Sequence, residues 1–430
     1  MFRQRACLAR RHSQLTTVLW LLPLLLVARK TLFLRIRDTS EFASIDRYAA
    51  VDITIVCFSV ALTVYTLASS PAVRRLVFHL TSVKALVTYY SLCMVSALWS
   101  SHPAYSAYRG LEALSQILII ACAVCTAPSV KHAERSALLG GLTVLACELL
   151  GAGLLCGFAP RIDAWHTNTY TATAAVLLCY CAGKSSRADR TGSKATMYLI
   201  GSVSCLALAL GASIGSNVAA AVGLCVVGLL VRPGALGLAL LTGLWVKVLT
   251  YSNAISEVVF EHRSEQTIHN ITGRTALWMD MFEGFKKSPW TGVGFAVGPH
   301  TLGHGGYSNS HNFIVSSAVG TGALGLLILL VYVWTQCREL WCNRAWARAG
   351  GAGTLACVLA AWTNSLTFPV LFDQWTCTAV VLCALVMARR EGDGLLRRQR
   401  AASRLDGIVN ARVYSRIASG RLTAAWARRA

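Results

Sequence analysis

The sequence predicts an all-α, polytopic membrane protein with about twelve transmembrane helices and one large extracytoplasmic loop that contains short amphipathic helices. Of its 430 residues, 55% are apolar and 14% are charged, which leaves little polar surface for a soluble protein of this length. The mean hydropathy is +0.53. The apolar residues form runs of about 20, the length that a helix needs to cross a bilayer. Helices are expected because they satisfy their own backbone hydrogen bonds in lipid.

The first expected span is the least regular, because its apolar stretch is short and Arg29 and Lys30 follow it directly. It fits either an uncleaved anchor or the hydrophobic region of a signal sequence. Since no small-x-small cleavage motif follows, we expect an anchor. The spans are expected at residues 16–34, 49–68, 77–98, 110–127, 136–158, 166–183, 195–211, 214–231, 234–250, 312–335, 351–370 and 374–388.

Basic residues orient the chain, because cytoplasmic loops of membrane proteins carry an excess of Lys and Arg. Most of the 40 basic residues fall in the loops that share a side with both termini, so we expect both termini in the cytoplasm. The segment 251–310 then lies outside the cytoplasm. The loop after the first span goes against the rule, with Arg29, Lys30, Arg35, Arg37 and Arg47.

Four parts follow from this pattern: helices 1–9 in residues 1–250, the extracytoplasmic loop 251–310, helices 10–12 in residues 311–388, and a basic tail at 389–430. The tail interleaves arginines with apolar residues. We expect it to bind anionic lipids, since each basic residue near such a surface contributes about 1 kcal/mol. No nucleic-acid recognition motif accompanies the positive charge, so nucleic acid is not an expected partner.

Two patterns look like cofactor motifs but lie within apolar spans. Cys122-x-x-Cys125 falls inside the fourth span, where cysteine behaves as a small hydrophobic residue. Residues 320–325 read Gly-Thr-Gly-Ala-Leu-Gly and match the dinucleotide fingerprint in letters. That fingerprint needs a strand before it and a helix after it, whereas glycines in a span let neighbouring helices approach closely. No cofactor is therefore expected.

The loop 251–310 contains a run with helical periodicity after Thr272, which is a plausible N-cap. Arg274 stands near the start of this helix, and Pro289 with the following glycines ends it in a turn. The pattern predicts a short amphipathic helix at the membrane surface. Its apolar face carries Leu277, Trp278, Met281, Phe282 and Phe285, and its polar face carries Asp280, Glu283, Lys286 and Lys287.

Histidines follow that turn. His300 and His304 have a metal-ligand spacing only on a helix, and the surrounding glycines argue against one, so no metal site is expected. His311 precedes the tenth span, where Ser308 or Ser310 can cap the helix. The positive end of the helix dipole favours a neutral imidazole, which can accept a proton as a general base. For a histidine considered in isolation, the better interpretation is that it anchors the helix at the interface.

Several of these segments together resemble the bacterial O-antigen ligase and polysaccharide polymerase superfamily. The resemblance extends from about residue 99 to 325 and agrees in spacing and topology. Its motifs are Gly273-Arg274-x-x-x-Trp278, Pro289-x-x-Gly292-x-Gly294, His311-Asn312 with Gly322-x-x-Gly325, and, more weakly, Trp99-Ser100-x-x-Pro103-x-x-Ser106-x-x-Arg109 and His166-x-Asn168.

The resemblance implies a metal-independent, inverting glycosyltransferase that moves a glycan from undecaprenyl diphosphate to an acceptor hydroxyl. His311 would take the proton of the acceptor and Arg274 would pair with the departing diphosphate, because a guanidinium donates two parallel hydrogen bonds to phosphate oxygens. Trp278, Asn312, His166 and Asn168 would contribute to substrate binding.

The family's ligases carry a second diphosphate-binding arginine near the start of the eighth span, and this chain departs from them there. Residues 211–217 read Gly-Ala-Ser-Ile-Gly-Ser-Asn and contain no arginine. Two replacements are open. The charge could come from Arg161, Arg109 or Arg263, or neutral donors could bind the phosphate oxygens, namely Ser213, Ser216 and Asn217.

Two family activities stay open, since nothing in the sequence identifies the acceptor. A polymerase joins repeat units on the carrier, a ligase transfers the glycan to lipid A core, and the missing arginine tilts the expectation slightly toward the polymerase. A chain-length regulator is a candidate partner. The alternative from another class is a secondary transporter, because Asp52, Glu112, Glu148 and Lys247 lie in or beside spans. The sequence contains no inverted repeat to support it.

Overall fold

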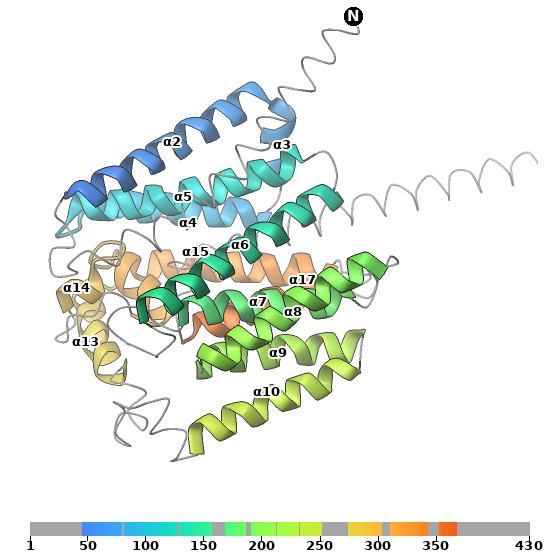
Figure 1. Cartoon of the computed structure of the whole chain (residues 1–430). Helices are drawn as coiled ribbons and strands as arrows, with labels where there is room; N and C mark the ends of the chain where they lie inside the picture. Colours follow the sequence, from blue (N-terminus) through green and yellow to red (C-terminus); the bar gives the residue numbers. More distant parts are fainter. Residues whose placement is uncertain are drawn as a thin grey trace, which may run out of the picture.

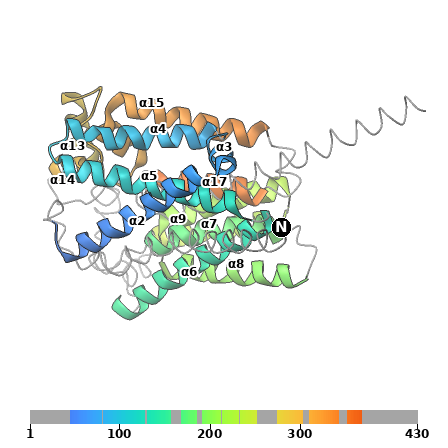
Figure 2. The same ribbon diagram turned by 90° about the horizontal axis from the view of Figure 1, so that it is seen from above.

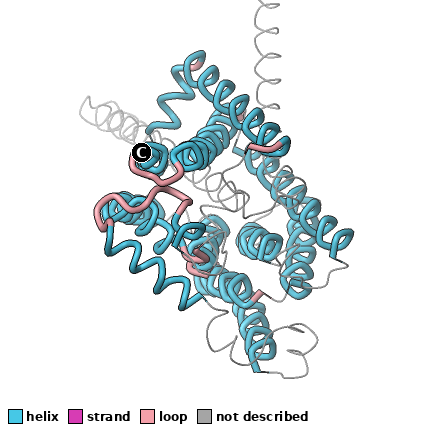
Figure 3. The backbone as a smooth tube through the Cα atoms, turned by 90° about the vertical axis from the view of Figure 1, so that its left-hand side faces the viewer, coloured by secondary structure: helices cyan, strands magenta, loops and turns pink. Residues whose placement is uncertain are grey.

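The computed structural model describes residues 45–79, 81–127, 130–156, 168–185, 191–211, 213–231, 233–251, 274–302, 310–342 and 352–367. In these ranges the chain is a bundle of helices joined by loops, without a strand (Figures 1 and 3). The predicted all-α fold is confirmed. The spans expected at 16–34 and 374–388, the basic tail, Arg161 and His166 lie outside the described residues.

The long helices follow the predicted apolar runs closely. They are α2 (Arg47–Ser69), α5 (Pro103–Thr126), α6 (Val130–Cys156), α7 (Asn168–Ser185), α8 (Thr191–Gly211), α9 (Ile214–Leu230), α10 (Gly234–Tyr251) and α15 (Phe313–Cys342). The third expected span, 77–98, is formed mainly by α4 (Thr81–Val95) and the 3-10 turn η2 (Ser96–Leu98), and only its first residues belong to α3 (Pro71–His79). Residues 352–365 form α17 (Ala352–Ser365), which ends earlier than the expected span.

Four of the described helices are long and apolar enough to cross a bilayer by length and composition. They are Ala49–Ser69, Pro103–Thr126, Lys194–Gly211 and Phe313–Arg338. Among the shorter apolar helices, Val83–Leu98 packs against two of them, Pro103–Thr126 and Phe313–Arg338. The chain is a multi-pass membrane protein, while the expected count of about twelve spans stays a prediction.

Two clusters of buried side chains form the core. One surrounds α7, whose residues Ala172 to Cys181 are all buried among α6, α8, α9, α10 and α17. The other joins α3, α4, α5 and α15, and includes Cys122 and Cys125, which lie in the interior of α5 as small apolar side chains. Trp362 of α17 packs against both clusters. The bundle is therefore continuous across α17.

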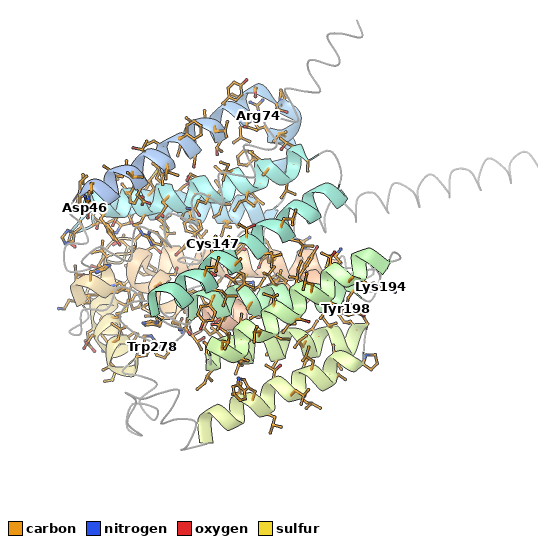
Figure 4. The ribbon with its side chains drawn as sticks, viewed as in Figure 1. Asp46, Arg74, Cys147, Lys194, Tyr198 and Trp278 are labelled. Carbon is orange, nitrogen blue, oxygen red and sulfur yellow. The ribbon has the colours of Figure 1, made fainter. Side chains whose placement is uncertain are left out.

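The predicted loop helix, α13 (Arg274–Lys287), and the short α14 (Gly298–Leu302) lie together at one end of the bundle in both views (Figures 1 and 2). Trp278 and Asp46 are at this end, whereas Arg74 and Lys194 lie toward the opposite end (Figure 4). We call the end that carries α13 the α13 end. The helices α7, α9 and α15 begin here and α17 finishes here, as their contacts below establish.

Candidate functional site

Helix α13 packs on the first turns of α15 rather than lying apart from the bundle. Leu277 and Met281, on its predicted apolar face, are buried against Val319 of α15. Phe282, which the pattern assigns to the same face, is 55% exposed and stacks on Phe285. The amphipathic helix is confirmed, but its buried stripe is narrower than predicted, because α15 and the short α14 cover only part of the predicted apolar face.

Two polar side chains of α13 reach neighbouring segments. Arg274, the first residue of the helix, donates from Nη1 to the carbonyl oxygen of Thr367 at 2.9 Å. Trp278, one turn further along, donates from Nε1 to the carbonyl oxygen of Ser310 at 2.7 Å. The start of α13 is thus attached both to the end of α17 and to the residue before His311.

Residues 310–312 form the entry to α15, and their cap differs from the prediction. The side-chain oxygen of Asn312, rather than that of Ser310, accepts from the backbone amides of Ile314 and Val315, at 2.9 and 3.3 Å. Asn312 is therefore the N-cap. Ser310 instead donates from Oγ to the carbonyl oxygen of Asn312 at 2.8 Å and closes the turn around His311.

His311 sits in this turn with a φ of 54°, in the left-handed region. A residue with a side chain is uncommon there, although histidine tolerates it better than most. Its backbone is fixed on both sides by the bonds of Ser310 and Asn312. Its Nδ1 atom is buried. Because strained backbone persists where the surroundings enforce it, and often at functional sites, this geometry favours a function for His311.

A group of neutral polar side chains lies where α7 and α9 begin and α17 ends. Ser213, the N-cap of α9, donates from Oγ to Oδ1 of Asn168 at 2.6 Å. Ser216 accepts from Oγ1 of Thr171 at 3.0 Å and from Nδ2 of Asn364 at 3.3 Å. We call Asn168, Thr171, Ser213, Ser216 and Asn364 the polar junction. All five are buried, so their hydrogen bonds offset the cost of removing them from water.

The end of α17 connects the polar junction to the α13 and α15 entries. Thr367 accepts from Arg274, and the adjacent carbonyl of Leu366 accepts from Nδ2 of Asn312 at 3.2 Å. On the other side, Gly215 of α9 lies so close to Thr367 that an added methyl group would overlap its hydroxyl. The N-terminal ends of α7, α9, α13 and α15 therefore meet around the C-terminal end of α17.

This convergence gives the site its electrostatics. The first amides of a helix carry a partial positive charge equivalent to roughly half an elementary charge. Four such ends and the Arg274 guanidinium together exceed the partial negative charge at the one C-terminal end, that of α17, so the net charge favours an anion at this place. The predicted site residues Arg274, Trp278, Asn312, Asn168 and Ser213 are thus brought together by the fold.

Arg109 occupies a different part of the bundle. On α5, its Nη1 atom lies 2.6 Å from Oε2 of Glu112, which is fully buried. Near it on the same helix, Tyr108 donates to the buried carboxylate of Asp52 on α2. The ion pair partly neutralises Arg109, so a role for it in diphosphate binding stays a prediction. Glu148 is also buried, on α6.

The loop after α13 interrupts α15 at the glycines that match a dinucleotide fingerprint. At Gly322, with φ 67° and ψ −166°, α15 departs from helical geometry. The loop backbone takes up the amides and carbonyls that this break releases. Four hydrogen bonds join the two segments: Val293 N to Val319 O (2.9 Å), Gly294 N to Gly320 O (3.0 Å), Ala323 N to Pro289 O (2.8 Å) and Leu324 N to Trp290 O (3.4 Å).

Glycine is required here because a methyl group on Gly322 would overlap the backbone of Trp290. The prediction that these glycines permit close packing is correct, but the prediction of a neighbouring helix is wrong. The approaching element is the loop 289–294. We call this contact the backbone lock, defined by residues 289–294 and 319–324.

The segment that precedes α5 fixes the other side of the same loop. Trp99 donates from Nε1 to the carbonyl oxygen of Thr291 at 2.8 Å. Ser106 donates from Oγ to the carbonyl oxygen of Phe295 at 2.9 Å, and the amide of Phe295 donates to Oγ of Ser96 at the same distance. The motif containing Trp99 and Ser106 thus makes structural contacts. These contacts hold it against the distant motif that contains Pro289, Gly292 and Gly294.

Sequence reasoning missed Thr171, Asn364 and Thr367. A signal for the latter two exists, because Thr363 to Thr367 places polar residues inside an apolar run, where polar groups in membranes are often functional. His300 packs edge-on against Tyr105, with ring centroids 5.9 Å apart. The part of the chain that the structure describes contains no cluster of three potential metal ligands. His304 lies outside it.

Comparison with protein families finds a match for one segment of the chain that carries part of this site. Residues 199–330 match the family model described as O-antigen ligase. This segment contains Ser213, Arg274, Trp278, His311 and Asn312, while α17 follows it. No curated protein matches the chain. The resemblance to the O-antigen ligase superfamily is confirmed over these residues.

Proposed function

Starting from an O-antigen ligase-like domain at residues 199–330, which indicates a ligase or polymerase type of activity, we propose a specific reaction. The protein is an inverting, metal-independent glycosyltransferase that moves a glycan from undecaprenyl diphosphate to an acceptor hydroxyl on the periplasmic face of the inner membrane. The observation that carries this proposal is the shared attachment of Arg274 and Asn312 to neighbouring carbonyls of α17, at 2.9 and 3.2 Å. This attachment connects Arg274 to the residue that follows His311 through two consecutive residues, Leu366 and Thr367.

His311 acts as the general base in this reaction. Because its Nδ1 is buried, Nε2 is the nitrogen that meets the acceptor. The acceptor oxygen forms a bond to the anomeric carbon while its proton moves to Nε2. The bond between that carbon and the diphosphate oxygen breaks, and the electron pair leaves with the diphosphate. Attack from the face opposite the leaving group inverts the anomeric configuration.

Arg274 and the helix ends stabilise the diphosphate. Negative charge grows on the leaving oxygen in the transition state, so a fixed cation there lowers the barrier. The N-terminal ends of α7 and α9, with Ser213 at the cap, support binding of the second phosphate without an arginine at residues 211–217. Of the two replacements for that arginine, we favour the neutral donors, because Ser213 lies at this site and Arg109 is paired with Glu112, while Arg161 and Arg263 lie outside the described residues.

The distribution of charge supports the proposed orientation. Trp278 and the end of α13 lie opposite Arg74 and Lys194 (Figure 4), as expected if basic residues mark the cytoplasmic side. A polymerase and a ligase share this chemistry and differ in acceptor. We favour the polymerase, with a chain-length regulator as a candidate partner and anionic lipids at the basic tail.

The test uses purified full-length protein with carrier-linked glycan and either a carrier-linked repeat unit or lipid A core as acceptor. We expect His311→Ala to abolish transfer and Arg274→Ala to lower it at least about 100-fold, the scale seen when a transition-state charge partner is removed. His300→Ala is the matched control, because this histidine lies at the same end but packs on Tyr105. It should retain full transfer.

Each alternative predicts a distinct result. A ladder of lengthening glycans without lipid A core identifies a polymerase, and a single product that requires lipid A core identifies a ligase. Wild-type transfer by the His311→Ala protein would exclude the base assignment. Uptake of substrate into proteoliposomes without glycan transfer would replace the enzyme with a transporter, for which Asp52, Glu112 and Glu148 would be the candidate residues.

A further inference from the structure

We propose that the last turn of α17, residues 364–367, is a positioning element that sets the separation between Arg274 and His311. This inference rests on the proposed glycosyl transfer and adds a part of the chain that lies outside the family match. The two catalytic candidates belong to different segments, α13 and the entry of α15. The reaction requires the base on the acceptor side of the anomeric carbon and the cation on the leaving-group side, so their separation has to be fixed.

Neighbouring carbonyls of this turn hold both segments. The oxygen of Thr367 accepts from Arg274 at 2.9 Å, and the oxygen of Leu366 accepts from Asn312, the residue after His311, at 3.2 Å. Because the two carbonyls belong to consecutive residues, the backbone conformation of the turn sets the distance between their oxygens. A displacement of Thr367 that changes this conformation therefore changes the separation between Arg274 and the His311 segment.

The turn is suited to bind a cation. The last carbonyls of a helix lack partners within the helix and carry a partial negative charge. Here the amides of Leu366 and Thr367 bond back to the carbonyls of Thr363 and Asn364, at 3.2 and 3.0 Å, which tightens the turn. The carbonyls that meet Arg274 and Asn312 are those just beyond this tight end.

Helix α9 supports the turn from behind. Asn364 donates from Nδ2 to Oγ of Ser216 at 3.3 Å. One residue earlier on α9, Gly215 lies against Thr367, and a methyl group at this position would overlap the Thr367 hydroxyl. The start of α9 thus packs against the turn and limits its position. A larger side chain at Gly215 should move Arg274 without removing any side chain or backbone amide that is proposed to touch substrate.

The first variant to test is Gly215→Ala. The added methyl group should push Thr367 and displace the carbonyl that holds Arg274. We expect kcat for glycan transfer to fall by about 10- to 100-fold with little change in KM, because misplacement by about 1 Å can cost a factor of 100. The control is Gly237→Ala on α10, where an added methyl meets no atom within 4 Å. It should retain wild-type kcat.

Rescue distinguishes displacement from general damage. Thr367→Ala removes the hydroxyl nearest to Gly215 and leaves the carbonyl that binds Arg274. Alone it should be close to wild type, and combined with Gly215→Ala it should restore most of the lost kcat. If the double variant stays as slow as Gly215→Ala, the displacement mechanism is wrong.

A second double variant tests whether Arg274 transmits the effect. If the turn acts through Arg274, adding Gly215→Ala to Arg274→Ala should slow transfer little further, since coupled residues give non-additive effects. Full additivity would overturn the proposal. Failure of the proposed function looks different, because wild-type protein would then transfer no glycan at all. Should Gly215→Ala transfer at the wild-type rate while Arg274→Ala is impaired, the enzyme assignment stands and the positioning role does not.

Discussion

The backbone lock and the polar junction both lie at the α13 end of the bundle, but they hold their helices with different chemistry. The lock joins loop 289–294 to α15 through four backbone hydrogen bonds at a break in the helix. The junction joins α7, α9 and α17 through side chains of Asn, Ser and Thr. A backbone lock specifies shape with almost no dependence on side-chain chemistry, apart from glycine. A side-chain junction supplies groups that can exchange partners with a substrate.

This difference assigns the two regions separate tasks. The lock fixes α13 and its loop relative to α15, and through Trp99 and Ser106 relative to the start of α5. The junction and the end of α17 then place polar groups around Arg274 and His311. The proposed reaction, in which the site binds a charged lipid carrier and releases it again, requires both rigid support and exchangeable donors.

The most severe way to break the lock is Gly322→Val. The residue has a φ of 67°, and a Cβ atom would overlap the backbone of Trp290. We expect a loss of about 3 kcal/mol or more, from backbone strain and from separation of the two segments. Little monodisperse protein should be recovered after detergent extraction.

Gly243→Val is the control for that experiment, because Gly243 lies on α10 and an added methyl meets no atom within 4 Å. Its yield should resemble that of the wild type. A normal yield and melting temperature for Gly322→Val would show that the loop and α15 are not locked as described.

Two substitutions of Asn312 separate stability from positioning. Asp keeps the oxygen that caps α15 but loses the Nδ2 donor to Leu366, so Asn312→Asp should leave stability nearly unchanged and lower transfer about tenfold, the equivalent of one lost polar contact of roughly 1.4 kcal/mol. Asn312→Ala loses the cap as well, and should cost about 1 kcal/mol of stability in addition. Thermal unfolding and transfer rates together check this.

Equal transfer by the Asp and wild-type proteins would show that the bond to Leu366 has no effect on catalysis. The region would then resemble the lock, a purely structural contact. Comparison with the Gly215→Ala result decides whether the carbonyl of Leu366 or that of Thr367 matters more.

Trp99→Phe should have the smallest effect. The substitution keeps the aromatic ring and removes one hydrogen bond, from Nε1 to the carbonyl oxygen of Thr291. We expect a loss of about 1 kcal/mol in unfolding free energy and unchanged transfer, because the four backbone bonds of the lock remain. A large fall in transfer with normal stability would show that Trp99 acts in the site itself rather than as structural support.

Apolar run length was sufficient to predict the helices, because each run has to satisfy its own backbone in lipid. The helical periodicity of Leu277 and Met281 predicts α13 and places Arg274 at its start. The cap of α15 was assigned to Ser308 or Ser310, whereas Asn312 forms it. Ser, Thr, Asp and Asn are all good caps, so composition does not choose between neighbours.

Sequence patterns do not predict contacts between segments that are distant along the chain. Thr367 is far from Arg274 along the chain, and its contribution is a backbone carbonyl, which no side-chain pattern reveals. For a related reason, the prediction that a helix packs on the Gly320–Gly325 run is wrong, and loop 289–294 lies there instead. Glycine indicates that something approaches closely, but a helix and a loop make the same demand.

During biosynthesis, the α17 turn is made after the segments that carry Arg274 and His311. Loop 289–294 and its partner at 319–324 are close in sequence, so the lock can form as soon as the first half of α15 leaves the ribosome. The carbonyls that accept hydrogen bonds from Arg274 and Asn312 belong to residues that are synthesised some fifty to ninety residues later. A partly synthesised chain therefore carries its catalytic candidates without the turn that aligns them, and the last described helix completes the site.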